Sequence, residues 1–193
     1  MSILFKQAII SLISYLIGCL NGAYYYGKIF KNMDIRNYGS GNPGALNSGR
    51  VFGRDGFIIV FFIDFLKGAI VVIIGRYYEL SNQGLVLAIL AVIAGHMYPV
   101  QLQFKGGKGM AAFLGALAFY DYIYVLYIVV VFLLFFILTR RFTISGLASL
   151  ILLPAILYFR GYASHEVLAM TVFALIIILR HRENIHDFLK PKN

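Results

Sequence analysis

Residues 122–139 read YIYVLYIVVVFLLFFILT, eighteen consecutive positions without a charged side chain. A helix that crosses the hydrocarbon core of a bilayer needs about 20 mostly apolar residues, because each residue advances it by about 1.5 Å. This stretch therefore predicts a membrane-spanning helix. Six further apolar stretches predict the same element: residues 4–27, 57–76, 84–104, 108–120, 144–159 and 166–180.

The composition of the 193-residue chain agrees with a membrane environment. Hydrophobic residues make up 61% and charged residues 13%, with a mean hydropathy of +0.82, whereas soluble domains are about half apolar and a quarter charged. A disulfide scaffold is excluded as well, because Cys19 is the only cysteine. We expect a single all-α transmembrane domain over residues 1–193: a seven-helix bundle, with some short spans and a short cytoplasmic surface helix.

The basic residues predict the orientation of this bundle. The chain has 17 Lys+Arg against 8 Asp+Glu, and basic residues in short loops favour the cytoplasmic face. With seven spans, segments 28–56, 105–108, 140–143 and 180–193 share one face and hold 13 of the 17 cations, against three on the other face. We expect the N-terminus outside and the C-terminus in the cytoplasm, and partners that are phosphates or lipid headgroups rather than nucleic acid.

The first polar segment on the basic face is residues 39–50, GSGNPGALNSGR. Asn42 followed by Pro43 is typical of a helix N-cap and first helical residue, and Gly53 is a suitable stop. A short surface helix is therefore predicted between these positions. The residues expected to share one side of it are Asn47, Arg50 and Arg54.

Phosphate binding is one interpretation of this segment. A glycine turn that leads into a helix N-terminus presents backbone N–H groups to an anion. The candidate phosphate-binding residues are Gly41, Asn42 and Asn47. The alternative is a membrane-surface helix whose arginines contact lipid headgroups.

A second polar segment lies between the third and fourth apolar stretches, where GHMYP at 95–99 is followed by KGGKG at 105–109. Glycine N–H groups and a helix dipole can face an anion while a lysine supplies the full charge. The candidates here are Lys105, Gly106, Gly107, Lys108 and Gly109. A nucleotide-hydrolysing P-loop is disfavoured, because Leu102 and Gly109 occupy the positions of its first glycine and its Ser/Thr. The alternative is a tight turn whose lysines only mark the cytoplasmic side.

Other polar residues have structural interpretations. RHRENIH at 180–186 is a basic end to the last helix, and Ser145 could be only an N-cap. His96 is expected to end a helix rather than to contact substrate. Asp64 and Lys67, at i and i+3 within a span, favour a structural ion pair over catalysis.

Groups for metal or nucleophilic chemistry are sparse. The carboxylates of the basic face are scattered: Asp34, Asp55, Glu183 and Asp187. Because Mg²⁺ takes grouped oxygen ligands, no metal is expected, and no cofactor. A GxSxG nucleophile elbow is also absent from the sequence. The expected site is rich in hydrogen-bond donors and poor in bases.

Four segments together resemble a known family. The segments 40–50, 64–68 (DFLKG), 95–109 and 180–185 are similar, in this order, to the signature regions of the bacterial acyl-phosphate:glycerol-3-phosphate acyltransferases. The resemblance covers nearly the whole chain and agrees with seven spans.

The resemblance implies transfer of a fatty acyl group from acyl phosphate to the 1-hydroxyl of sn-glycerol 3-phosphate, the first step of phospholipid synthesis, at a bacterial cell membrane. It implies that the phosphate pocket is lined by Ser40, Arg50, Lys108 and Ser145. It further implies that His181 and Asn184 hold the glycerol phosphate, and that the donor's own phosphate takes the proton.

This sequence departs from the family pattern at two places. Leu46 replaces a threonine beside the first phosphate loop, and the spacing before Ser145 is one residue longer. These departures leave open a paralogue with another acceptor. Two rival hypotheses are a thioester donor and a transporter or channel for organic anions, although a transporter is expected to have polar groups near the midplane of paired, interrupted spans.

Overall fold

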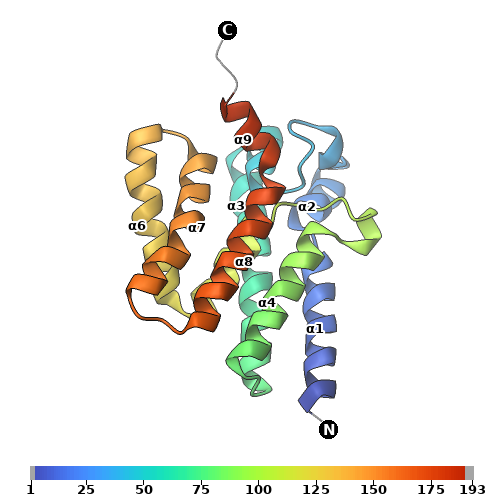
Figure 1. Cartoon of the computed structure of the whole chain (residues 1–193). Coiled ribbons are helices and arrows are strands. Elements are labelled where there is room, and N and C mark those ends of the chain that lie inside the picture. The colour runs from blue at the N-terminus through green and yellow to red at the C-terminus, as the bar shows by residue number, and fades with distance from the viewer. Residues whose placement is uncertain (1–2, 190–193) are drawn as a thin grey trace. The chain divides into compact units, whose positions relative to one another are not determined.

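The computed structural model describes residues 3–189, and their side chains over 3–186. Every element in this part of the chain is helical (Figure 1), which confirms the all-α prediction. The elements are α1 (Ile3–Cys19), α2 (Gly22–Lys31), η1 (Ile35–Asn37), α3 (Ala45–Tyr77), α4 (Asn82–Met97), η2 (Val100–Leu102), α5 (Met110–Tyr120), α6 (Tyr122–Thr139), α7 (Phe142–Phe159), α8 (Ser164–Arg180) and α9 (Arg182–Leu189). Lys190 and Lys192, two of the predicted cytoplasmic cations, lie outside the described residues.

Each of the seven predicted spans contains a helix, but not all of these helices are long. Four are long and apolar enough to cross a membrane, and the bent pair α1–α2 makes a fifth candidate. α5 has 11 residues and α8 has 17, so seven crossings stay a prediction. Apolar side chains such as Leu12, Phe62 and Leu134 are more than half exposed, as expected for surfaces that face lipid.

The first predicted span is not one continuous helix. α1 ends at Cys19, and α2 begins at Gly22 with a bend of 42° between them. Asn21 causes the restart, because its backbone is extended and its side chain accepts the Tyr24 N–H at 2.9 Å. The prediction of a single helix over residues 4–27 is therefore wrong. The short helix α9 was not expected either.

The start of α3 also differs from the prediction. Its N-cap is Gly44, without a side-chain bond, rather than Asn42. Pro43 stays outside the helix because its carbonyl accepts a hydrogen bond from Asn21 Nδ2 at 3.1 Å. The predicted stop is confirmed as a break: Gly53 has φ 79°, and the chain resumes a helical path beyond it as part of α3.

The chain divides into two compact units, Met1–Tyr120 and Asp121–Asn193. In the first unit α1 packs on α4, and α3 on α5. Glycines permit these close approaches: a Cβ on Gly18 would overlap the Val92 carbonyl, and a Cβ on Gly115 would overlap the Phe65 carbonyl. In the second unit α7 packs on α6 and α8. The single-domain organisation stays a prediction.

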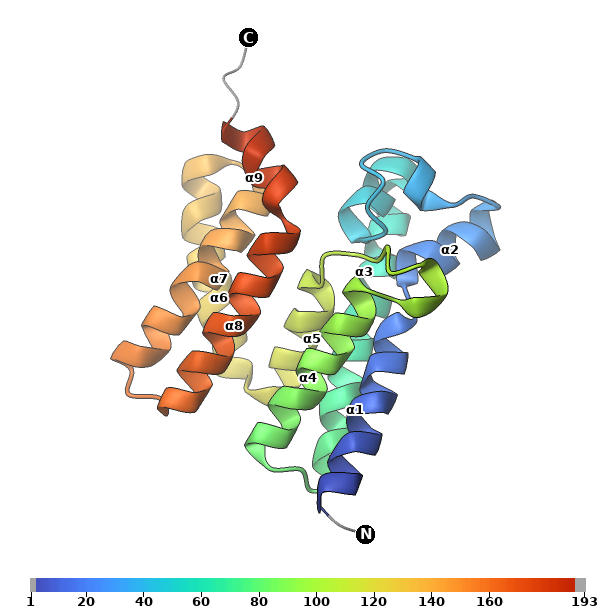
Figure 2. The same cartoon turned by 45° about the vertical axis from the view of Figure 1, so that its right-hand side comes forward.

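Two irregular segments of the first unit lie at one end of that unit. Figure 2 shows the chain between α2 and α3, and the chain between α4 and α5, on the side away from the N-terminus. In the second unit, the α6–α7 turn and α9 lie at one end (Figure 1). Folding thus places the loops that hold predicted site residues at one end of each unit.

Candidate functional site

The loop that contains Ser40 is fixed by Asn47. The Asn47 side chain is buried, and its Oδ1 accepts the Ser40 N–H at 2.8 Å, while its Nδ2 donates to the Tyr38 carbonyl at 2.9 Å. Arg50 is exposed, and Arg54 lies beyond the break at Gly53. The predicted common side does not extend to Arg54, because the helical path breaks at Gly53, and Asn47 turns inward to hold the loop.

Arg36 joins this loop to the next one, a role that the sequence did not indicate. Its guanidinium pairs with Asp34, with Nη2 and Oδ2 2.7 Å apart, and its Nη1 donates to the Leu102 carbonyl at 3.2 Å. The hydrogen bond and the charge of Arg36 hold the pKa of the Asp34 carboxyl below its usual value. No local pattern reveals a partner 66 residues away.

The glycine-lysine loop, residues 105–109, folds back onto the end of α4. Gly106 donates its N–H to the Met97 carbonyl at 3.1 Å, and Gly107 donates to the His96 carbonyl at 3.0 Å. These two N–H groups are thus engaged within the protein. Phosphate binding by Gly106 and Gly107 stays a prediction. Lys105 is exposed and Lys108 is half-buried.

The two glycine-containing loops touch. A Cβ on Gly107 would overlap the His96 ring at Nε2 and lie 2.9 Å from the Pro43 carbonyl oxygen. Only glycine fits there, because the backbones of the two loops pass so closely. The structure therefore brings the loop of Ser40, Gly41 and Asn42 beside the loop of Lys108 and Gly109, at one end of the first unit.

The second unit carries the remaining predicted site residues. Ser145 is buried one turn inside α7, where its Oγ donates to the Arg141 carbonyl at 2.9 Å; the helix N-cap is Arg141, so an N-cap role for Ser145 is wrong. His181 ends α8 and donates from Nδ1 to the Ile177 carbonyl at 2.8 Å. Asn184 lies half-buried in α9. Their meeting with Ser40, Arg50 and Lys108 stays a prediction.

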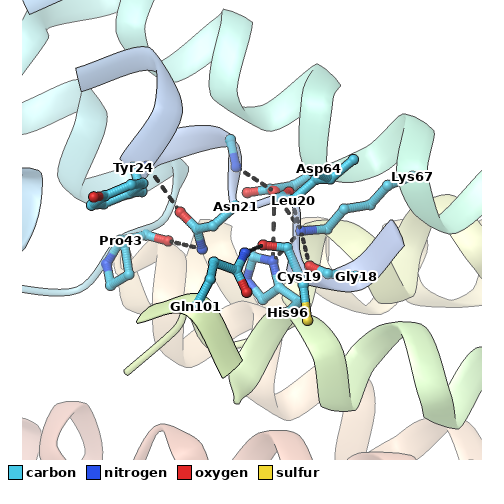
Figure 3. Close-up of polar contacts among 11 residues, drawn as sticks. Gly18, Cys19, Leu20, Asn21, Tyr24, Pro43, Asp64, Lys67, His96 and Gln101 are labelled. Carbon is cyan, nitrogen blue, oxygen red and sulfur yellow. Dashed lines mark hydrogen bonds and ion pairs between the residues drawn. The ribbon is translucent and has the colours of Figure 1, made fainter. Parts of the chain in front are cut away.

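A buried polar cluster lies behind the loops of the first unit (Figure 3). Lys67 Nζ is 2.9 Å from Asp64 Oδ1, which confirms the predicted ion pair. His96 Nδ1 lies 2.6 Å from the same Nζ. All three side chains are at least 95% buried. The sequence did not indicate the part played by His96, because 29 residues separate it from Lys67.

Comparisons with known proteins identify the family. The family model described as glycerol-3-phosphate acyltransferase matches residues 8–191. A glycerol-3-phosphate acyltransferase 1 of Bacillus cereus (strain ATCC 10987) is 44% identical over 86% of this chain and 90% of its own length. One of Desulfitobacterium hafniense (strain Y51) is 38% identical over 93% of this chain and 89% of its own length.

Solved structures agree with this result. The chain resembles a crystal structure of PlsY (YgiH), an integral membrane glycerol 3-phosphate acyltransferase, in its glycerol 3-phosphate form. The TM-score is 0.87 and the identity 35%, over 95% of this chain and 92% of the other. The lysophosphatidic acid form matches with a TM-score of 0.82 and 33% identity over the same shares. This chain therefore belongs to the glycerol-3-phosphate acyltransferase family and is an integral membrane acyltransferase.

Proposed function

We propose that this chain transfers a fatty acyl group from acyl phosphate to the 1-hydroxyl of sn-glycerol 3-phosphate, giving lysophosphatidic acid and phosphate. The names of the relatives and the glycerol 3-phosphate form of the similar structure support the acceptor. The chemistry of the site supports the donor. An acyl phosphate brings a second phosphate, and cationic, glycine-containing loops are suited to hold both.

The contact between the two loops is the observation that carries this proposal. The Arg36 bond to Leu102 and the approach of Pro43 to Gly107 hold the loops together. We assign phosphate binding to residues of these loops and of the following helix: Ser40, Gly41, Asn42, Arg50, Lys105, Lys108 and Gly109. Asn47 supports its loop instead, because its carboxamide is bonded to loop backbone.

Residues of the second unit complete the proposed site. We assign Ser145 to phosphate binding, and His181 and Asn184 to the glycerol phosphate. Nδ1 of His181 donates to the Ile177 carbonyl, which fixes the orientation of the ring. The resemblance to the family supports these three assignments.

The reaction needs little more than placement of its two substrates. The acceptor oxygen forms a bond to the acyl carbon while the bond from that carbon to the phosphate oxygen breaks, and the hydroxyl proton passes to the departing phosphate. Lys108 and Arg50 would stabilise the negative charge that develops at the attacked carbonyl, and positioning the acceptor supplies much of the remaining rate. Asp34 and Asp64 are paired with Arg36 and Lys67, which supports proton transfer to phosphate rather than to these carboxylates.

We further propose a cell membrane location with the N-terminus outside and the site facing the cytoplasm. The excess of cations on the loops that hold the proposed site supports this orientation. A cysteine placed at exposed Gln83, on the opposite face, should react with a membrane-impermeant maleimide in intact cells. Protection of that cysteine until the cells are opened would reverse the orientation.

The donor is tested with purified protein in lipid vesicles and labelled glycerol 3-phosphate. Acyl phosphate, acyl-CoA and acyl carrier protein are supplied in separate reactions. We expect labelled lysophosphatidic acid with acyl phosphate only. Product from a thioester would contradict the donor, and uptake of label into the vesicles without product would indicate a transporter.

A further inference from the structure

The break between α1 and α2 is filled by the side chains of Asp64 and Lys67. In an unbroken helix the Gly22 N–H would bond to the Gly18 carbonyl. Here Lys67 Nζ donates to the carbonyls of Gly18 and Leu20, at 3.1 Å each, and Asp64 Oδ1 accepts the Gly22 N–H at 3.3 Å. Figure 3 shows both side chains reaching the break from α3. Backbone groups released at a break must find partners when water is scarce, and this ion pair provides them.

His96 is the third member of this cluster. Its Nδ1 lies 2.6 Å from Lys67 Nζ and 3.5 Å from Asp64 Oδ1. The Lys67 ammonium group pairs with Asp64 and donates to two carbonyls. His96 Nδ1 accepts a further hydrogen bond from it when the ring proton is on Nε2. One positive and one negative charge leave the cluster neutral, which is the condition for burying it.

The other side of His96 supports the glycine-lysine loop. His96 lies in the last turn of α4, and its carbonyl accepts the Gly107 N–H at 3.0 Å. The Nε2 edge of its ring occupies the space that a Cβ on Gly107 would need. The next carbonyl, of Met97, accepts the Gly106 N–H at 3.1 Å. His96 therefore holds Gly107 through its backbone and its ring, one residue before Lys108.

We propose that Asp64, Lys67 and His96 are a positioning set, which transmits the fixed geometry of the α1–α2 break to the glycine-lysine loop and so places Lys108. These residues act through the loop and not on the reacting atoms. The identity of the phosphorylated ligand rests on the proposed function, whereas the effect on the loop does not. Asn21 extends the same arrangement to the neighbouring loop, because it caps α2 and holds the Pro43 carbonyl.

The test measures amide hydrogen exchange in the glycine-lysine loop and enzyme kinetics, both on the full chain reconstituted in lipid. In His96→Ala, the amides of Gly106 and Gly107 should exchange with solvent on the order of tenfold faster than in the wild type. The value of kcat/KM should fall on the order of 10²-fold, because small misplacements at a site have such effects. The double variant Asp64→Asn/Lys67→Met removes both charges together and should give the same pattern. It also provides the measurement if His96→Ala does not fold.

A conservative variant separates positioning from acid–base chemistry. In His96→Asn, the side-chain oxygen can replace Nδ1 as the acceptor for Lys67. We expect this variant to recover most of the loop protection and activity, with the pH profile of the wild type. The proposal would be overturned if His96→Asn were as inactive as His96→Ala and its kcat/KM no longer fell at low pH as in the wild type. That result would make His96 a catalytic base.

Gln7→Leu is the matched control. Gln7 Nε2 donates to the Gly84 carbonyl at 3.1 Å, so it too joins α1 to α4, at the other end of this helix pair. Its replacement should lower stability but leave loop exchange and kcat/KM unchanged. Wild-type exchange and kcat/KM in His96→Ala, or the same loop effect in Gln7→Leu, would overturn the proposal. A failure of the donor assay would leave the exchange results standing, so the two proposals can fail separately.

Discussion

The two compact units hold their functional side chains by contacts of different reach. In the first unit, Arg36 bonds to a carbonyl 66 residues away, and Lys67 to carbonyls 47 and 49 residues away. In the second unit, Ser145 and His181 each bond to a carbonyl four residues earlier on their own helix. Folding of the first unit thus fixes one loop against another. These bonds tie Ser145 and His181 to their own helices, and Thr139 Oγ1, 3.1 Å from Ser145 Oγ, links Ser145 to α6 as well.

From this difference we propose that the two units take different parts in the reaction. A site whose groups are locked by their surroundings can stabilise developing charge without reorganisation. We therefore expect losses in the rate of turnover from changes in the first unit, and losses in acceptor binding from changes in the second. Four substitutions, taken from the largest expected effect to the smallest, examine this contrast.

Lys108→Ala should have the largest effect. Removing the half-buried lysine of the glycine-lysine loop should lower turnover on the order of 10³-fold, because its charge acts on the transition state. Labelled lysophosphatidic acid measures the rate, and thermal unfolding should match the wild type. Lys105→Ala gives a graded comparison: this more exposed lysine is also assigned to phosphate binding, and its loss should lower turnover less. A Lys108→Ala enzyme as active as the wild type would refute the assignment of the site.

Asn184→Ala, in the second unit, should raise the KM for glycerol 3-phosphate roughly tenfold to 100-fold. The reason is the loss of a hydrogen bond to a charged group, worth about 1.5–3 kcal/mol. Exchange at Gly106 and Gly107 should not change, and Glu183→Gln, at an exposed neighbouring position, should leave KM unaltered. If Asn184→Ala lowers kcat at an unchanged KM, the proposed division between the units is wrong.

Asp34→Asn should affect stability in a pH-dependent way. Arg36 lowers the folded-state pKa of Asp34, so the pair stabilises the fold fully above the unfolded-state pKa of about 4. This stability is lost as pH falls through the lower folded-state pKa. For this partly exposed pair we expect about 1 kcal/mol at neutral pH. Thermal unfolding of the two proteins should differ at pH 7 and converge in strong acid; a constant difference would mean that the charge of Asp34 is irrelevant.

Leu46→Thr should have the smallest effect. Leu46 is 39% exposed at the start of α3, and exposed substitutions change stability by about 0.5 kcal/mol or less. We expect the KM for glycerol 3-phosphate to change no more than about threefold, in line with that energy. A much larger gain in activity would indicate that Leu46 selects a different acceptor.

Hydropathy and charge predicted most of the helices, but not the tertiary contacts at the positions where helices are interrupted or begin. The apolar run 122–139 forms α6 as expected. A helix that contacts lipid needs apolar side chains whatever its tertiary neighbours are, so its sequence alone reveals it. The break at Asn21 and the start of α3 beyond Pro43 depend on groups far along the chain, so composition over 4–27 could not reveal them. Window-based hydropathy also missed α9, whose sequence is polar.

For the candidate site, the glycines and lysines of the two loops favoured phosphate binding, which stays a prediction. The structure places these two loops in contact. The roles of Arg36 and His96 could not be predicted, because they depend on tertiary partners. Arg36 bonds to the Leu102 carbonyl, and His96 contacts Lys67 and Gly107. A residue that acts by positioning another residue through tertiary contacts has no local sequence pattern that reveals this role.

A distance between the units tests the central claim most directly, namely that cationic segments of both serve one pair of phosphorylated substrates at one membrane face. Spin labels are attached to cysteines at Val100 and Glu183, two exposed positions beside the predicted site residues, in a Cys19→Ala background. We expect a main distance in lipid well below about 30 Å, the thickness of the hydrocarbon core. A main distance of about 30 Å or more would place the two sets of residues apart and contradict it.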